Sequence, residues 1–192
     1  MQAQKKGVLF VISGPSGVGK ATLKKRLLEE FEGQIVDSVS ATTREPREGE
    51  LDGREYFFIS RQEFERRVEN NDFLEHAEFS GNCYGTPREN VMNLLSQGID
   101  VVLEIDVQGA RQVRKQMPDC VSIFILPPSF EELEHRLRER HTETEEKVLA
   151  RLETAKREIP CAGEYDYQIV NNDLDAAYDR LRSVYMQAAH RT

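Results

Sequence analysis

The stretch Gly14-Pro15-Ser16-Gly17-Val18-Gly19-Lys20 decides the fold of this 192-residue chain. It follows the apolar run Val8–Ile12 and precedes residues 22–28, in which apolar side chains recur at helical spacing. A strand, a glycine-rich loop and a helix in this order form the context that a phosphate-binding P-loop requires. A purely structural glycine turn is the alternative, but the G-x-x-x-x-G-K spacing in this context favours phosphate binding.

The composition of this loop predicts how it would hold a nucleoside triphosphate. Its glycines let backbone N–H groups converge on one anion, and the following helix adds the positive end of its dipole. Lys20 would reach the β- and γ-phosphates. The motif expects a Mg²⁺-ligating hydroxyl next, but the chain has Ala21 there and Thr22 one position later. Either phosphates, water and a carboxylate elsewhere hold the metal, or activity is impaired.

Composition and charge limit the class of protein. Hydrophobic residues are 39% of the chain and charged residues 31%, which suits one folded domain. The net charge of −8 disfavours general binding to nucleic acid, and no apolar run approaches the ~18 residues of a membrane span. Cys83, Cys120 and Cys161 lack C-x-x-C spacing, and the polar N-terminus does not resemble a secretory signal. We therefore expect a cytoplasmic protein with reduced thiols.

The order of the expected elements predicts an α/β fold. Strands separated by helices form a parallel sheet with helices on both faces. A mixed, polar stretch at about 38–98 interrupts this core between the second and third strands. Core strands are expected at 8–12, 35–36, 101–106, 121–126 and 167–170, with helices that include 107–116.

Turn and cap signals divide the interrupting stretch. A capping box that begins at Ser60 predicts a helix at about 61–70. The alternation of Phe73–Phe79 predicts a strand, and Gly81-Asn82 is expected to form a hairpin turn. Thr86, followed by a proline, is expected to be the N-cap of the next helix.

A first group of polar residues in this stretch could hold a phosphate. Two guanidinium groups backed by hydroxyls can fork onto phosphate oxygens, and phenols can add donors. Ordinary surface arginines on an exposed loop explain the pattern equally well. The group consists of Ser40, Thr42, Thr43, Arg44, Arg47, Tyr56 and Tyr84.

A second group, Ser40, Glu75 and Thr86, could read a guanine base. One carboxylate can accept from the adjacent N1 and N2 donors of guanine, and hydroxyls can donate to O6. Adenine lacks that donor pair and would leave the buried carboxylate unpaired. From the residues alone a structural explanation is stronger, because Thr86 serves as a helix cap and Glu75 as a solvent-facing strand residue.

A third group, Arg136, Arg140 and Arg151, could neutralise charge during phosphoryl transfer. Arg136 and Arg140 are one helical turn apart, and Arg151 lies on the next helix, whose cap is expected at Thr142. A solvated helix face paired with nearby glutamates is the more usual explanation. The four histidines show no metal-ligand spacing. A monophosphate acceptor is already a dianion near neutral pH and needs no general base.

Five segments together resemble the guanylate kinase family over nearly the whole chain. A P-loop alone would indicate only nucleotide binding, but the second and third segments are highly specific together. The segments are Gly14–Lys20, Ser40–Tyr56 with its pattern S-A-T-T-R-E-P-R-x-G-E-x-x-G-x-x-Y, Glu75–Thr86, Leu103–Gly109 and Ile169–Leu174.

The resemblance implies transfer of a phosphoryl group from ATP to GMP with Mg²⁺, giving ADP and GDP in purine nucleotide metabolism. It implies one domain, with a core at 1–37, 99–136 and 161–192, a GMP-binding region at 38–98 and a helical lid at 137–160. The lid would close over both nucleotides. The implied partners are thus small molecules, not nucleic acid or a membrane, and self-association of the chain stays open.

The resemblance also implies a role for each matching residue. ATP would contact the loop residues from Gly14 to Thr22, and Asn171 would lie by the adenine. Mg²⁺ would have no direct protein ligand and would be held mainly by phosphates and water, with Asp106 near its water shell. The residues implied for transfer are Lys20, Arg44, Arg136, Arg140 and Arg151. Those implied for GMP are Ser40, Arg44, Arg47, Tyr56, Glu75, Tyr84, Thr86, Glu104 and Asp106.

Two departures and two alternatives accompany this resemblance. Ala21 replaces the loop hydroxyl, and Cys83 replaces a usual aromatic residue but should point opposite to Tyr84. A non-catalytic module that grips a phosphorylated partner is one alternative, although such modules lack the loop lysine that this chain keeps as Lys20. A P-loop kinase for another phosphorylated acceptor is the other, and the guanine-reading group argues against it.

Overall fold

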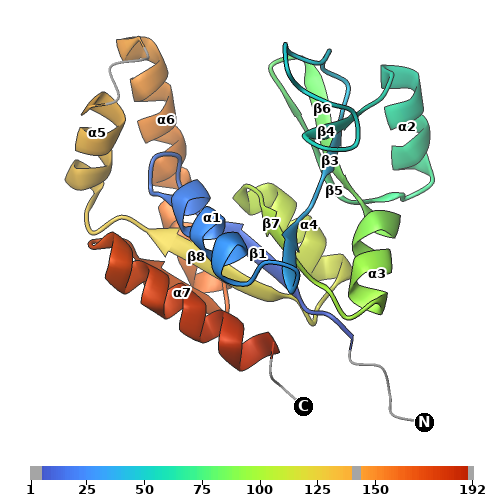
Figure 1. Cartoon of the computed structure of the whole chain (residues 1–192). Helices are drawn as coiled ribbons and strands as arrows, with labels where there is room; N and C mark the ends of the chain where they lie inside the picture. The colour runs from blue at the N-terminus through green and yellow to red at the C-terminus, as the bar shows by residue number, and fades with distance from the viewer. Residues whose placement is uncertain (1–5, 140–143, 190–192) are drawn as a thin grey trace.

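Two β-sheets stand beside each other in the computed structural model, which describes residues 6–139 and 144–189 (Figure 1). The larger sheet has five parallel strands, in the order β2-β7-β1-β8-β9. Its strand β1 is central and completely buried. In chain order the strands are β1 (Leu9–Ser13), β2 (Ile35–Asp37), β7 (Asp100–Glu104), β8 (Val121–Leu126) and β9 (Tyr167–Val170).

Helices cover both faces of this sheet because successive side chains of its strands point to opposite faces. Phe10 and Ile12 belong to one apolar cluster, and Leu9 and Val11 to the other. The first cluster lies under α1 (Lys20–Glu30), α5 (Phe130–Glu139), α6 (Glu145–Glu158) and α7 (Leu174–Ala189). The second lies under α3 (Arg88–Ser96), α4 (Val107–Gln116) and the 3₁₀ helix η1 (Ile159–Glu164).

The smaller sheet is the stretch that interrupts the core, as the sequence predicts. Its order is β4-β3-β6-β5, with β3 and β4 parallel and the other neighbours antiparallel. Helix α2 (Arg61–Glu69) packs on it through Phe64, which is buried with Phe73 and Cys83. The strands are β3 (Ser40–Thr42), β4 (Tyr56–Phe58), β5 (Phe73–Phe79) and β6 (Asn82–Pro87).

Two local predictions are wrong, and the smaller sheet explains both. The hairpin turn is made by Ser80 and Gly81, which have φ angles of 50° and 77°, while Asn82 already pairs with Phe79. Thr86 lies inside β6 and pairs with β5, so Pro87 takes the N-cap position of α3. Helix α6 has Thr144 at its N-cap, and the expected cap Thr142 lies outside the described residues.

Across residues 6–139 and 144–189, the structure contains no helix with the length and apolar character needed to cross a membrane. The parallel α/β core, its flanking helices and the mixed insertion agree with the fold predicted from the sequence. Because the five strands of the larger sheet all run parallel, their carboxyl ends lie at the same side of that sheet. In α/β sheets this side holds the ligand.

Candidate functional site

The glycine-rich loop curls around the ammonium group of Lys20. The Nζ atom donates to the carbonyl oxygens of Gly14 at 2.6 Å and Pro15 at 3.0 Å. Gly14 has a φ angle of 145°, and a Cβ there would lie 2.3 Å from the carbonyl oxygen of Ile125, so only glycine fits. Burial lowers the pKa of Lys20, and the negative charge of Glu104 opposes this shift. A partly buried cation at a helix N-terminus is suited to phosphate binding.

Asn171 and Arg136 support this loop from the side of β9 and α5. The buried Asn171 side chain donates from Nδ2 to the carbonyl oxygen of Val18 at 2.8 Å. Arg136 donates from Nη1 to the main-chain oxygen of Asn171 at 3.0 Å and from Nε to Glu132 at 2.8 Å. The side-chain amide of Asn171 therefore helps hold the loop, and a contact with adenine stays a prediction.

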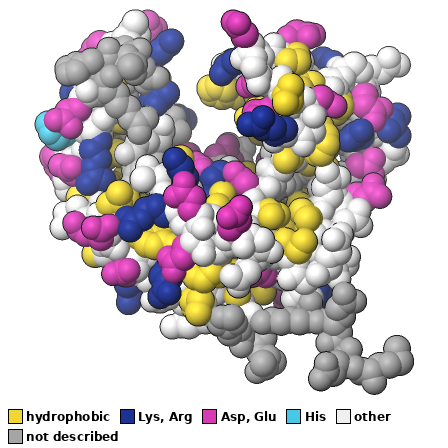
Figure 2. Space-filling model, in the orientation of Figure 1, with side chains coloured by type: hydrophobic (Ala, Val, Ile, Leu, Met, Phe, Trp, Pro, Cys, Tyr) yellow, Lys and Arg dark blue, Asp and Glu magenta, His cyan; other side chains and the backbone are white. Residues whose placement is uncertain are grey.

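An open cleft of about 880 Å³ brings the predicted groups together. Figure 2 shows this hollow between the lobe of α5 and α6 and the lobe of the smaller sheet. The cleft is lined by the loop, the segment after β7, the β5–β6 hairpin and α6. The polar side chains among its lining residues are Ser16, Lys20, Arg47, Ser80, Glu104, Asp106, Lys147, Arg151, Thr154 and Glu158.

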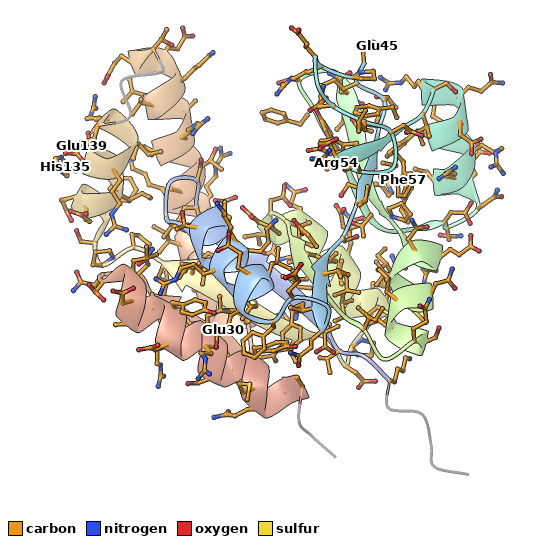
Figure 3. All side chains as sticks on the ribbon, in the orientation of Figure 1. Glu30, Glu45, Arg54, Phe57, His135 and Glu139 are labelled. Carbon is orange, nitrogen blue, oxygen red and sulfur yellow. The ribbon has the colours of Figure 1, made fainter. Side chains whose placement is uncertain are left out.

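One arginine of α6 reaches the loop across this cleft. Arg151 donates from Nη1 to the hydroxyl of Ser16 at 3.1 Å. The loop and Arg151 therefore meet in the cleft, and Arg136 is linked to the loop through Asn171. Arg140 lies outside the described residues. His135 and Glu139 project from the outer side of α5, away from the cleft, and are 3.2 Å apart (Figure 3).

A smaller cavity of about 170 Å³ adjoins the cleft at Glu104 and Ile105, which line both. It brings together Ser40, Tyr56 and Thr86, three of the residues predicted to contact GMP. The cavity thus lies between the two sheets, beside the end of β7.

Glu75 is buried beside this cavity and does not face solvent, so that interpretation of its position is wrong. The hydroxyl of Thr86 donates to Glu75 Oε1 at 2.7 Å, because β5 and β6 place the two residues directly opposite each other. Burial raises the pKa of Glu75, and the charge of Asp106 adds to this shift. Asp106 itself accepts from the backbone N–H of Gly109 at 2.7 Å as the N-cap of α4. A buried carboxylate with one occupied oxygen is an acceptor for a ligand's donors.

The residues predicted to bind a phosphate are of two kinds: an arginine with two neighbouring phenols, and two threonines that join strands. Arg44 donates to Glu50 Oε1 at 2.9 Å, and its guanidinium carbon lies 5.5 Å from the centre of the Tyr56 ring. The Tyr84 ring lies 6.0 Å from that of Tyr56, so Arg44 and both phenols are neighbours. Thr42 donates its hydroxyl to the carbonyl of Cys83 at 3.0 Å. The Thr43 hydroxyl accepts a hydrogen bond from the N–H of Cys83 at 2.9 Å. Both threonines therefore join the segment of β3 to β6.

Lys24 also lies at the site, although it is not among the residues predicted from the sequence. Its Nζ lies 2.6 Å from Asp37 Oδ2 and 3.2 Å from Glu104 Oε2, on the wall of the smaller cavity. Burial alone would lower the pKa of Lys24, but the hydrogen bond and charge of Asp37, with Glu104, raise it overall. The signal was its position one helical turn after Lys20, which points it along the same side of α1.

Comparisons with known proteins agree with this geometry. The family model described as Guanylate kinase matches residues 6–188. The chain belongs to the guanylate kinase family. A guanylate kinase from Nostoc sp. is 54% identical over 89% of this chain and 85% of its own, and one from Caldanaerobacter subterraneus subsp. tengcongensis is 48% identical over 96% and 89%. The crystal structure of guanylate kinase from Anaplasma phagocytophilum superposes with a TM-score of 0.74 at 40% identity, covering 98% of this chain and 89% of that one.

The carboxylates that line the cleft of this guanylate kinase family member are candidates for helping to hold a metal ion. Among the described residues, no group of three or more His, Cys, Asp and Glu is arranged to hold a metal ion. Glu104 and Asp106 nevertheless line the cleft beside Lys20, and carboxylate oxygens suit Mg²⁺. These donors fit a metal that is carried mainly by phosphates and water.

We expect Glu75→Gln to stabilise the protein more at pH 8 than at pH 4. The raised pKa means that the folded protein keeps this proton to higher pH than the unfolded chain, so ionisation costs folding free energy as pH rises. Melting temperatures of both proteins from pH 4 to 8 measure the effect. The exposed Glu29→Gln on α1 is the control, and a difference between Glu75→Gln and wild type that does not widen with pH would contradict the assignment.

Proposed function

We propose that this protein transfers the γ-phosphoryl group of ATP to GMP, giving ADP and GDP. The observation that carries the proposal is the buried Glu75–Thr86 pair, close to the cleft that contains the P-loop lysine. A P-loop suits the triphosphate donor, and a buried carboxylate suits the paired N1 and N2 donors of guanine. Membership of the guanylate kinase family supports the same pair of substrates.

The base and the phosphate of GMP are read by different groups. Glu75 accepts from guanine N1 and N2, the Ser40 hydroxyl faces O6, and the Thr86 hydroxyl holds Glu75 Oε1. The proximity of Ser40 and Thr86 in one cavity supports this arrangement. The phosphate of GMP is held by Arg44, Arg47, Tyr56 and Tyr84.

The transfer reaction needs charge neutralisation more than proton transfer. A dianionic phosphate oxygen of GMP forms a bond to the γ-phosphorus while the bond to the β-γ bridging oxygen breaks, and ADP leaves with that electron pair. Lys20 and the arginines Arg44, Arg136, Arg140 and Arg151 neutralise charge on the oxygens in the transition state. The donation from Arg151 to Ser16 supports its part in this group. A bound Mg²⁺ would supply charge neutralisation on the ATP phosphates, and Glu104 and Asp106, which line the cleft, would help hold it through water.

The regions of the chain divide this work. The core at 1–37, 99–136 and 161–192 binds ATP, with Asn171 by the adenine. The region at 38–98 binds GMP, and the lid at 137–160 closes over both. The lining of one cleft by the loop, the hairpin and α6 supports this division. Among the described residues the thiols of Cys83, Cys120 and Cys161 are free, which is compatible with action in the cytoplasm.

The acceptor preference tests this proposal directly. With ATP and Mg²⁺, we expect ADP to form rapidly with GMP and at least ~100-fold more slowly with AMP, UMP or CMP. A coupled assay of ADP measures each acceptor separately. Equal turnover of another acceptor would contradict the guanine-reading site. Binding of GMP by folded protein without turnover would favour a binding module over a kinase.

The loop lysine should be essential for transfer. We expect Lys20→Ala to lower kcat by ~100-fold or more, because charge on the γ-phosphate would lose its closest cation. Lys25→Ala, on the exposed side of the same helix, is the matched control and should behave like wild type. Wild-type turnover in folded Lys20→Ala would remove the loop from the mechanism.

The departure at Ala21 gives a separate prediction. A hydroxyl at this position can ligate Mg²⁺, so we expect Ala21→Ser to reach half-maximal activity at a lower Mg²⁺ concentration. Titration of Mg²⁺ at fixed ATP measures the change. Superimposable titrations of the variant and wild type would mean that the metal is held without this hydroxyl.

A further inference from the structure

We propose that one face of α4, formed by Gly109, Gln112 and Gln116, positions the Glu75 carboxylate and thereby sets acceptor specificity. The inference rests on the proposed GMP site and assigns these three as positioning residues. They are spaced by three and then four positions, so they share one side of the helix. Strand β5, which carries Glu75, lies against this side.

Two glutamines tie the main chain of β5 on either side of Glu75. Gln112 accepts the N–H of His76 at 3.1 Å and donates to the His76 carbonyl at 3.0 Å. Gln116 donates to the carbonyl of Leu74 at 2.8 Å. Because β5 ends the order β4-β3-β6-β5, its outer edge presents main-chain groups that need partners. The two amides supply such partners and dock the edge of the smaller sheet on a helix of the core.

The side chain of Leu74 strengthens this attachment. Leu74 is completely buried and belongs to the same apolar cluster as Val107, Ala110 and Val113 of α4. Hydrogen bonds and apolar packing therefore fix β5 immediately before and after Glu75. The main chain that carries the Glu75 carboxylate is held on both sides, so the residue has little freedom to move.

Gly109 provides the room that the carboxylate occupies. A Cβ at this position would lie 3.0 Å from Glu75 Oε2 and 3.4 Å from Ile105 Cβ. Gly109 is buried in the first turn of α4, where alanine would favour the helix. Its backbone is helical, so its conformation does not require glycine. Space for Glu75 is the physical reason for a glycine here.

Together these contacts give the carboxylate one orientation. Thr86 holds Oε1, while Oε2 lies in the space above Gly109, at the positive end of the α4 dipole. Accepting hydrogen bonds from two adjacent donors requires both carboxylate oxygens to be well placed. A shift of the Glu75 carboxylate by a few tenths of an ångström should therefore weaken the binding of GMP without affecting the binding of ATP. The helix thus acts through Glu75 and not on the phosphates.

The variant Gly109→Ala tests this inference. We expect its KM for GMP to rise about tenfold, its KM for ATP to stay unchanged and its preference for GMP over IMP, which lacks the N2 donor, to fall. Its melting temperature shows whether the variant is folded, because the helix preference of alanine and the crowding of Glu75 act in opposite directions. The control is Gly163→Ala, since within the described chain an added Cβ there would have no heavy atom within 4 Å. A wild-type KM for GMP in Gly109→Ala, or an equal rise in both KM values, would overturn the proposal.

Gln112→Leu is an independent variant should Gly109→Ala fail to fold. It keeps the bulk of the side chain and removes both bonds to His76, so the KM for GMP should rise while that for ATP does not. The control is Gln187→Leu on the exposed side of α7. If Gln112→Leu and Gln187→Leu had the same KM for GMP and the same KM for ATP, the proposal that Gln112 positions Glu75 would be overturned.

A double-mutant cycle separates positioning from general damage. Without the Glu75 side chain there is nothing for a Cβ at position 109 to crowd, so Gly109→Ala should not weaken GMP binding further in a Glu75→Ala background. Calorimetric dissociation constants for GMP measure this. The same loss in both backgrounds would overturn the inference. Absence of GMP turnover in the wild-type protein would instead refute the proposed function itself.

Discussion

The curl of the glycine-rich loop over Lys20 is the constraint on which the rest of the structure depends. The ammonium group donates hydrogen bonds to two carbonyl oxygens of its own loop. Neighbouring elements contact the same loop. Strand β8 approaches Gly14 through Ile125, and Asn171 after β9 bonds to Val18. The loop therefore needs β1 at the centre of the sheet with β8 and β9 beside it. The five-stranded order supplies that arrangement and leaves the carboxyl ends of the strands to form the cleft.

A second constraint is the buried carboxylate between the two sheets. Placing Glu75 out of water costs folding free energy, and its raised pKa reflects that cost. Thr86, the first turn of α4 and the tied edge of β5 offset part of it. Such a group specifies a ligand that brings two donors and penalises one that leaves it unpaired. A fold can keep an unfavourable residue such as the buried Glu75 at a functional position, because the rest of its interactions stabilise the structure.

Local patterns predicted most of the fold, but contacts between distant segments decided the site. The helix at 107–116 and the strands at 121–126 and 167–170 match because their signals lie within the elements themselves. Thr86 shows the opposite case. It has the sequence signature of a helix cap, yet the pairing of β5 with β6 gives its hydroxyl to Glu75. The bonds from Gln112 to His76 span 36 positions, so no local pattern could indicate them.

The measurement that tests the account most directly is calorimetric binding of GMP and IMP to the wild-type protein and to Glu75→Gln. The two ligands differ only in the N2 amino group, which we assign to the Glu75 carboxylate. The account predicts that wild-type protein binds GMP at least about tenfold more tightly than IMP, and that Glu75→Gln loses this preference. A preference for GMP that survives unchanged in a folded Glu75→Gln variant would contradict the assignment of the guanine-reading site.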